Sequence, residues 1–112
     1  MDNCIPATLL PLGYNGKILL LSINADGIDE AIILRCGDLW HSEILRATEN
    51  EIKGYGLKFP IIDELGGAWV RFDSEGNILI FGTSEEYGSC DKNCAADLLR
   101  QLYPDRLVRI EP

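Results

Sequence analysis

His41 is the only histidine in the sequence, and histidine is the side chain whose ordinary pKa lies nearest neutrality. It follows Trp40, where an extended, turn-rich pattern changes to a helical one. A histidine at such a place can act as general acid or base, or as a nucleophile. Most lone histidines are instead surface residues or are hydrogen-bonded to a nearby carbonyl group. If the protein is an enzyme, however, His41 is the residue at which we expect its chemistry, because it is the only histidine of the sequence.

The pattern after His41 predicts a helix that ends at Gly54 or Gly56. Its buried stripe recurs every fourth residue, at Ile44, Thr48 and Ile52, with Leu45 beside it. His41 then lies at the first turn, where free backbone N–H groups and the helix dipole attract an anion. The same field favours a neutral imidazole, whereas Asp38 and Glu43 act in the opposite direction. The sequence leaves this balance open.

The loop over residues 82–88, Gly-Thr-Ser-Glu-Glu-Tyr-Gly, could hold an oxyanion. It combines hydroxyl groups with backbone N–H donors between an apolar strand and a predicted helix. It is neither a Walker loop nor a Gly-x-Ser-x-Gly nucleophile elbow. Glu85 and Glu86 would repel phosphate if their carboxylates pointed inward, and would offer only backbone N–H groups if they pointed outward. The alternative is a polar loop whose glycines serve its turns.

The cysteines are a weaker indication of chemistry. The four are Cys4, Cys36, Cys90 and Cys94. Cys90 and Cys94 would share a helix face, which is compatible with half a metal site or a redox pair. One histidine and two remote cysteines do not complete a structural zinc site, so ordinary packing or surface thiols are favoured and no metal is expected. A thiol function remains an alternative for Cys90, because a helix N-terminus nearby could lower its pKa.

The elements that position these residues follow from the apolar periodicity. Strands are predicted at 17–24, 28–35, 61–65 with 68–72, 78–81 and 107–110. Gly66 and Gly67 indicate a bulge or a close backbone approach. A second helix, capped by Asp91 or Ser89 and ended by Pro104, has the apolar stripe Cys94, Ala95, Leu98, Leu99 and Leu102. About five or six strands and two amphipathic helices predict an α+β fold, with the helices packed on one mixed β-sheet.

Length, composition and charge exclude several classes of protein. The 112 residues are expected to form a single domain, and 46% hydrophobic with 25% charged residues is typical of a globular protein. The longest strongly apolar run, residues 18–21, is far shorter than the roughly 20 residues that span a bilayer. The segment Met1–Cys4 has neither the basic start nor the apolar stretch of a secretory signal, so a cytoplasmic location is expected.

The net charge of −8, from 18 acidic and 10 basic residues, opposes binding to a phosphate backbone. Nucleic acid is therefore not expected as a partner, and the shortness of the apolar runs gives no reason to expect a membrane. The basic residues are scattered, although a few of them could still converge on one small anionic group. The sequence does not indicate the oligomeric state.

The segment after residue 80 resembles the signature of the phosphohistidine phosphatase family, also called Janus/Ocnus. The residues that match are Phe81-Gly82-x-Ser84-x-x-Tyr87-Gly88, followed by Tyr103-Pro104 near the end of the second helix. The resemblance extends back through Leu65-Gly66-Gly67 and Trp40-His41 to Lys17. It covers about residues 16–110, and the order and spacing of the motifs are more specific than any one of them.

This resemblance implies a six-stranded sheet between two α-helices. It also implies a phosphatase that hydrolyses phosphoramidate (P–N) bonds such as phosphohistidine, without a metal or other cofactor. His41 would be the catalytic residue, as general base or nucleophile, and Lys17 would bind or steer the phosphoryl group. The Ser84 hydroxyl and the backbone N–H of Glu86 would hold phosphate oxygens. The substrate would be a phosphorylated protein or a small phosphoramidate.

The chain departs from the family pattern at Trp69, where family members of the animal type carry an arginine. Arg71 would lie on the same face of the strand and could substitute, or could be a solvated arginine near the hairpin. The segment between Arg35 and His41 is also shorter than in the family. Trp69 and the Glu85-Glu86 pair support an alternative function, a non-catalytic module of the same fold that binds phosphopeptides or another protein.

Overall fold

Strands and helices follow one another in the predicted order along residues 5–38 and 40–111, which are the residues that the computed structural model describes. The elements are β1 (Gly16–Ala25), β2 (Ile28–Gly37), α1 (His41–Lys53), β3 (Ile61–Phe72), β4 (Ile78–Phe81), α2 (Lys92–Leu102) and β5 (Val108–Ile110). The predicted segments 61–65 and 68–72 are one continuous strand, β3. Cys4 and the segment Met1–Cys4, on which the expectation about a secretory signal depends, lie outside the described residues.

The described strands form one five-stranded mixed sheet in the order β2-β1-β3-β4-β5. All neighbours are antiparallel except β4 and β5, which are parallel. The chain before β1 adds a single parallel bridge outside β2, between Thr8 and Leu34. In this bridge the Leu34 N–H donates to the Ala7 carbonyl at 2.8 Å. The sequence did not predict this pairing, which is too short to show a periodicity.

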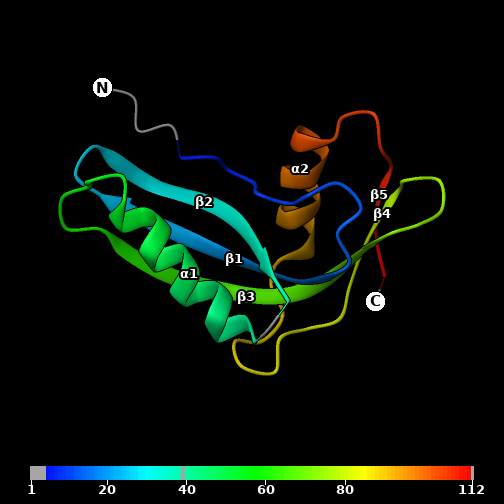
Figure 1. Cartoon of the computed structure of the whole chain (residues 1–112), viewed down its shortest axis with the longest axis horizontal. Coiled ribbons are helices and arrows are strands. Elements are labelled where there is room, and N and C mark those ends of the chain that lie inside the picture. The colour runs from blue at the N-terminus through cyan, green and yellow to red at the C-terminus, as the bar shows by residue number, and fades with distance from the viewer. Residues whose placement is uncertain (1–4, 39, 112) are drawn as a thin grey trace.

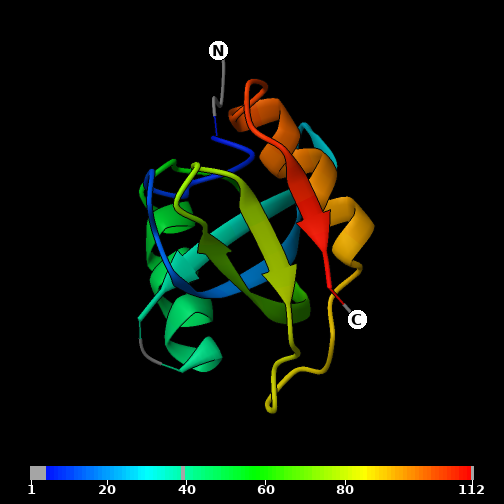
Figure 2. The same ribbon diagram turned by 90° about the vertical axis from the view of Figure 1, so that its right-hand side faces the viewer.

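The two helices cover opposite faces of the sheet, as Figures 1 and 2 show. Alternate residues of β1 belong to different core clusters, because successive side chains of a strand point to opposite faces. Ile18 and Leu20 pack in the cluster that contains Ala95 and Leu99 of α2. Leu19, Leu21 and Ile23 pack in the cluster that contains Ile44 and Ile52 of α1. The predicted α+β fold, with a sheet between two helices, is confirmed.

α1 buries most of its predicted stripe, and α2 buries part of its predicted stripe. In α1 the buried residues are Ile44, Thr48 and Ile52, together with His41. In α2 the buried residues are Ala95, Ala96 and Leu99, and the Asp91 side chain caps the helix by accepting from two backbone N–H groups. Leu102, the last residue of the predicted apolar stripe, is not buried. It is 40% exposed because it is the last residue of α2 and lines a surface pocket beside Leu12.

Gly66 and Gly67 create the bulge that the sequence predicts. Leu19 pairs with Gly67 and Leu21 pairs with Glu64, so β3 has one residue more than β1 between these pairs. At Gly66, where φ is +101°, a Cβ atom would lie 2.8 Å from the backbone of Ser89 and Cys90. The bulge therefore brings the chain just before α2 against β3. Of the helices in the described part of the chain, none has the length and apolar character needed to cross a membrane.

Candidate functional site

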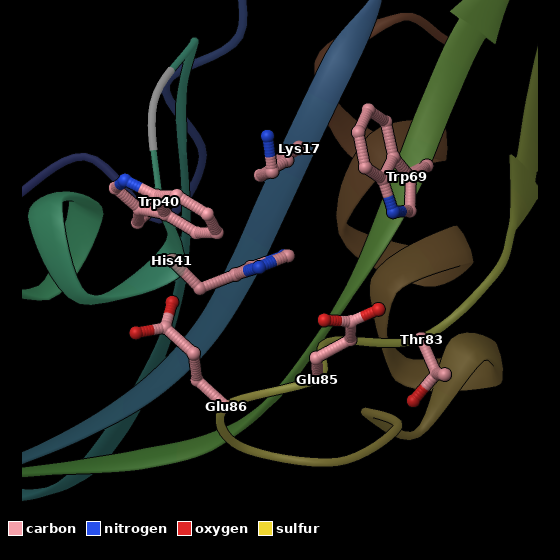
Figure 3. Close-up of a pocket in the computed structure, with 7 residues that line it drawn as sticks. All are labelled: Lys17, Trp40, His41, Trp69, Thr83, Glu85 and Glu86. Atoms are coloured by element: carbon pink, nitrogen blue, oxygen red, sulfur yellow. The ribbon is translucent and has the colours of Figure 1, made fainter.

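A pocket of about 280 Å³ lies where α1 begins, between the sheet and the loop that follows β4. Its lining residues are Lys17, Trp40, His41, Trp69, Thr83, Glu85 and Glu86. Figure 3 shows that they come from β1, from the start of α1, from β3 and from the 82–88 loop. The fold thus brings Lys17, His41 and Glu86, which are far apart in the sequence, to one pocket.

His41 is the first residue of α1 and is only 3% exposed, although its ring borders the pocket. Its Nε2 lies 3.3 Å from the carbonyl oxygen of Ala68. A carbonyl oxygen can only accept, so this hydrogen bond requires the proton on Nε2 and leaves the lone pair of the neutral ring on Nδ1. The imidazole is therefore oriented by the backbone of β3, with Nδ1 as its basic and nucleophilic atom.

Gly67 provides the space for the His41 ring. A Cβ atom at position 67 would lie 2.5 Å from Cδ2 and 2.7 Å from Nε2 of His41. Any larger residue would displace the imidazole or the strand, because contacts this short are repulsive. The glycine of the bulge and the histidine of the helix are therefore complementary in shape.

Lys17 and Trp69 face each other across β1 and β3. The Nζ atom of Lys17 lies 4.5 Å from the centroid of the Trp69 ring, which is a cation–π contact. Trp69 is itself packed against Gly82, where a Cβ atom would lie 2.8 Å from its Cδ1. Within the described residues, the ammonium of Lys17 has no ion pair or hydrogen bond. Its N–H donors are available to a ligand.

Ser84 does not line the pocket and is only 3% exposed. Its Oγ accepts the backbone N–H groups of Glu86 at 3.2 Å and Tyr87 at 3.1 Å. These bonds hold the loop in its turn. A phosphate oxygen could accept from the Glu86 N–H, as the family resemblance implies, only by replacing the Ser84 Oγ, whereas the O–H of Ser84 is not used in these two bonds. Thr83, which the sequence analysis did not single out, is the hydroxyl residue that lines the pocket.

Glu86 caps α1 from outside the helix. Its Oε1 accepts the backbone N–H of Ser42 at 3.0 Å, whereas Trp40, at the N-cap position, provides no side-chain hydrogen bond. The hydrogen bond from the Ser42 N–H lowers the pKa of Glu86. The position that the helix start offers to an anion is thus taken by a carboxylate of the chain itself.

Both loop carboxylates line the pocket, which answers the question of orientation that the sequence left open. Glu85 is exposed, and in the described part of the chain its carboxylate has no hydrogen bond or ion pair. The lining side chains include one cation, Lys17, and two anions. This arrangement differs from the purely cationic site that would suit a free phosphate ion.

Arg71 lies on the same side of β3 as Trp69 but is not brought to His41. Its guanidinium carbon lies 5.9 Å from the centroid of the Phe81 ring. It lines a neighbouring pocket, which shares Trp69 with the pocket of His41. Arg71 thus follows Trp69 as the next residue on the same face of β3, and its guanidinium lies over the ring of Phe81.

The described cysteines, Cys36, Cys90 and Cys94, are free thiols. Burial raises the pKa of each. For Cys90 this is the opposite of the lowered pKa that a reactive thiolate requires. Across residues 5–38 and 40–111, no group of three or more His, Cys, Asp or Glu side chains is arranged to hold a metal ion.

The model of the Janus/Ocnus family (Ocnus) matches residues 15–106. The matched region contains every residue that lines the pocket, and it covers most of the chain. No curated protein sequence matches the chain.

Proposed function

The chain belongs to the Janus/Ocnus family, and we propose that it is a metal-independent phosphatase that hydrolyses phosphoramidate bonds such as that of phosphohistidine. The observation that supports this function is the convergence of Lys17 and His41 on one pocket. The substrate would be a phosphorylated protein or a small phosphoramidate in the cytoplasm. Neither nucleic acid nor a membrane is proposed as a partner.

Lys17 would bind the phosphoryl group. Phosphoryl transfer depends mainly on positioning and on stabilising charge on the phosphoryl oxygens. The ammonium of Lys17 has free donors, and Trp69 holds it beside the pocket. The Glu86 N–H would add a donor if the ligand replaced its hydrogen bond to Ser84, and the Ser84 O–H, which that bond does not use, would add another. Arg71 would contribute only at longer range, from its position over Phe81.

His41 would act through Nδ1, because Nε2 is engaged with Ala68. As a general base, Nδ1 takes a proton from water while the water oxygen bonds to phosphorus and the P–N electron pair leaves with nitrogen. As a nucleophile, Nδ1 bonds to phosphorus itself, and water then cleaves that second P–N bond. Both routes give inorganic phosphate and the free amine or imidazole.

A non-catalytic binding module is the second candidate, and the two carboxylates in the pocket favour it. Glu85 and Glu86 oppose the negative charge that accumulates on a transferring phosphoryl group, whereas Trp40 and Trp69 offer surfaces for a peptide. Such a module would hold a phosphorylated peptide through Lys17 without cleaving it.

Phosphorus NMR of a phosphohistidine peptide distinguishes the two functions. With a catalytic amount of protein, the phosphatase converts the P–N signal into that of inorganic phosphate over many turnovers. A binding module shifts or broadens the P–N signal at stoichiometric protein and releases no phosphate beyond the rate without protein. The second result would contradict the proposed phosphatase.

A further inference from the structure

The free charges of the pocket are one cation and one anion. Glu86 is engaged with the Ser42 N–H, whereas the Lys17 ammonium and the Glu85 carboxylate have no polar partner among the described residues. Figure 3 shows the His41 side chain between these two groups, with Lys17 on one side and Glu85 on the other. A ligand that satisfies both free charges must itself be positive at one end and negative at the other.

A phosphate ester does not meet this requirement. Its phosphoryl group is negatively charged and is bonded to an uncharged ester oxygen. The ester would therefore be attracted by Lys17 and repelled by Glu85. A phosphoramidate that is protonated on its nitrogen-containing group is a zwitterion. Its phosphoryl oxygens would pair with Lys17 and its nitrogen cation with Glu85. The charges of the pocket therefore select the nitrogen-linked compound.

Trp40 adds a preference for shape. Its side chain is 66% exposed and borders the pocket, whereas one face of Trp69 already holds the Lys17 ammonium. A planar cation such as an imidazolium or a guanidinium can stack flat on a free indole face, and a tetrahedral ammonium cannot. The exposed indole thus suits a flat, positively charged leaving group.

We infer that Trp40 and Glu85 form a leaving-group subsite for a planar nitrogen cation that bears the phosphoryl group. The inference rests on the proposed function, and its ligands are phosphorylated imidazolium and guanidinium groups. When the P–N bond breaks, its electron pair goes to nitrogen and cancels the positive charge, while water supplies the new P–O bond. Glu85 stabilises the protonated form from which this departure is easiest.

The test compares peptides of one sequence that carry phosphohistidine, phosphoarginine or phospholysine, with p-nitrophenyl phosphate as the ester. The variants are Glu85→Gln and Trp40→Leu. Their controls are Glu75→Gln, in the exposed β3–β4 turn, and Phe59→Leu, an aromatic residue that is 87% exposed. The phosphohistidine and phosphoarginine arms separate the two planar ligands, and phospholysine supplies the tetrahedral cation.

We expect kcat/KM to be about tenfold higher for at least one planar substrate than for phospholysine, given the strength of cation–π and ionic contacts. Each variant should lower that value about 3- to 10-fold on the planar substrate and change hydrolysis of the ester by a smaller factor. The controls should change neither. Equal loss on all substrates, or no loss, would overturn the subsite.

Binding separates this inference from the proposed hydrolysis. The same peptides are titrated by calorimetry into His41→Ala and, as a second inactive variant, His41→Gln. Tighter binding of a planar ligand, lost in the Glu85→Gln double variants, supports the subsite even if the wild-type protein releases no phosphate. Turnover by the wild type with equal affinity for planar and tetrahedral ligands would support the phosphatase and remove the subsite.

Discussion

The ammonium of Lys17 lies 4.5 Å from the centroid of the Trp69 ring, directly across the β1–β3 pair. Trp69 occupies the position where the family resemblance leads one to expect an arginine. The pocket therefore has Lys17 as its cation and no arginine beside it. Trp69, which stands where the arginine is expected, contacts the ammonium of Lys17. The indole holds the ammonium of Lys17 in the pocket that His41 also lines.

Replacing Trp69 with alanine should weaken substrate binding more than it weakens the chemical step. The loss of a cation–π contact of about 0.5–1 kcal/mol leaves the Lys17 ammonium free to move into solvent, so KM should rise about 2- to 5-fold. Trp69→Phe, which keeps an aromatic face, should show a smaller rise. Steady-state kinetics on a phosphohistidine peptide measures both. A normal KM for the alanine variant would show that Trp69 does not position Lys17.

Gly67→Ala should reduce activity at least tenfold, because the new methyl group would overlap the His41 ring and move Nδ1 away from the substrate. Overpacking of this kind costs about 1–3 kcal/mol of unfolding free energy. Gly54→Ala is the matched control, since Gly54 has helical dihedral angles at the other end of α1. Activity and urea unfolding are measured for both. A fully active Gly67→Ala protein would contradict the conclusion that the His41 ring needs the space beside Gly67.

The fold could be predicted from the sequence to a greater extent than the pocket. The four-residue spacing of Ile44, Thr48 and Ile52 and the glycine pair of β3 each have a direct structural meaning, and both were confirmed. The bridge at Thr8 was missed because one pair of residues has no periodicity. The direction in which a loop side chain points also cannot be predicted from the sequence. Both glutamates of the loop line the pocket, and Glu86 caps α1 through a contact with Ser42, which is 44 positions away in the sequence.

The contact between Glu86 and Ser42 should make stability depend on acidic pH. The pKa of Glu86 is lowered in the folded protein, so its carboxylate stabilises the fold fully above the ordinary glutamate pKa of about 4.3. This contribution is lost as the pH falls through the lower pKa of the folded state. Urea unfolding between pH 7 and pH 3 should show a stability advantage of the wild type over Glu86→Gln that shrinks toward the acidic end. A constant difference over this range would contradict the cap.

Nitrogen NMR of the imidazole should find the proton of the neutral ring on Nε2. The hydrogen bond to the Ala68 carbonyl requires this tautomer, because the carbonyl has no proton to donate. Two-bond ¹⁵N–¹H correlations of the single histidine identify the protonated nitrogen without ambiguity. A ring protonated on Nδ1 at high pH would make Nε2 the reactive atom and would reverse the orientation described above.

The rate of phosphate release from a phosphohistidine peptide by the wild-type protein and by His41→Ala tests the proposed function most directly. Circular dichroism establishes that the variant is folded, and His41→Gln serves as a second variant that preserves the volume of the buried side chain. We expect the wild type to release phosphate over many turnovers and both variants to be slower by at least 100-fold, as is typical when a general base or nucleophile is removed. Equal rates for the wild type and the folded variants would contradict a catalytic role of His41.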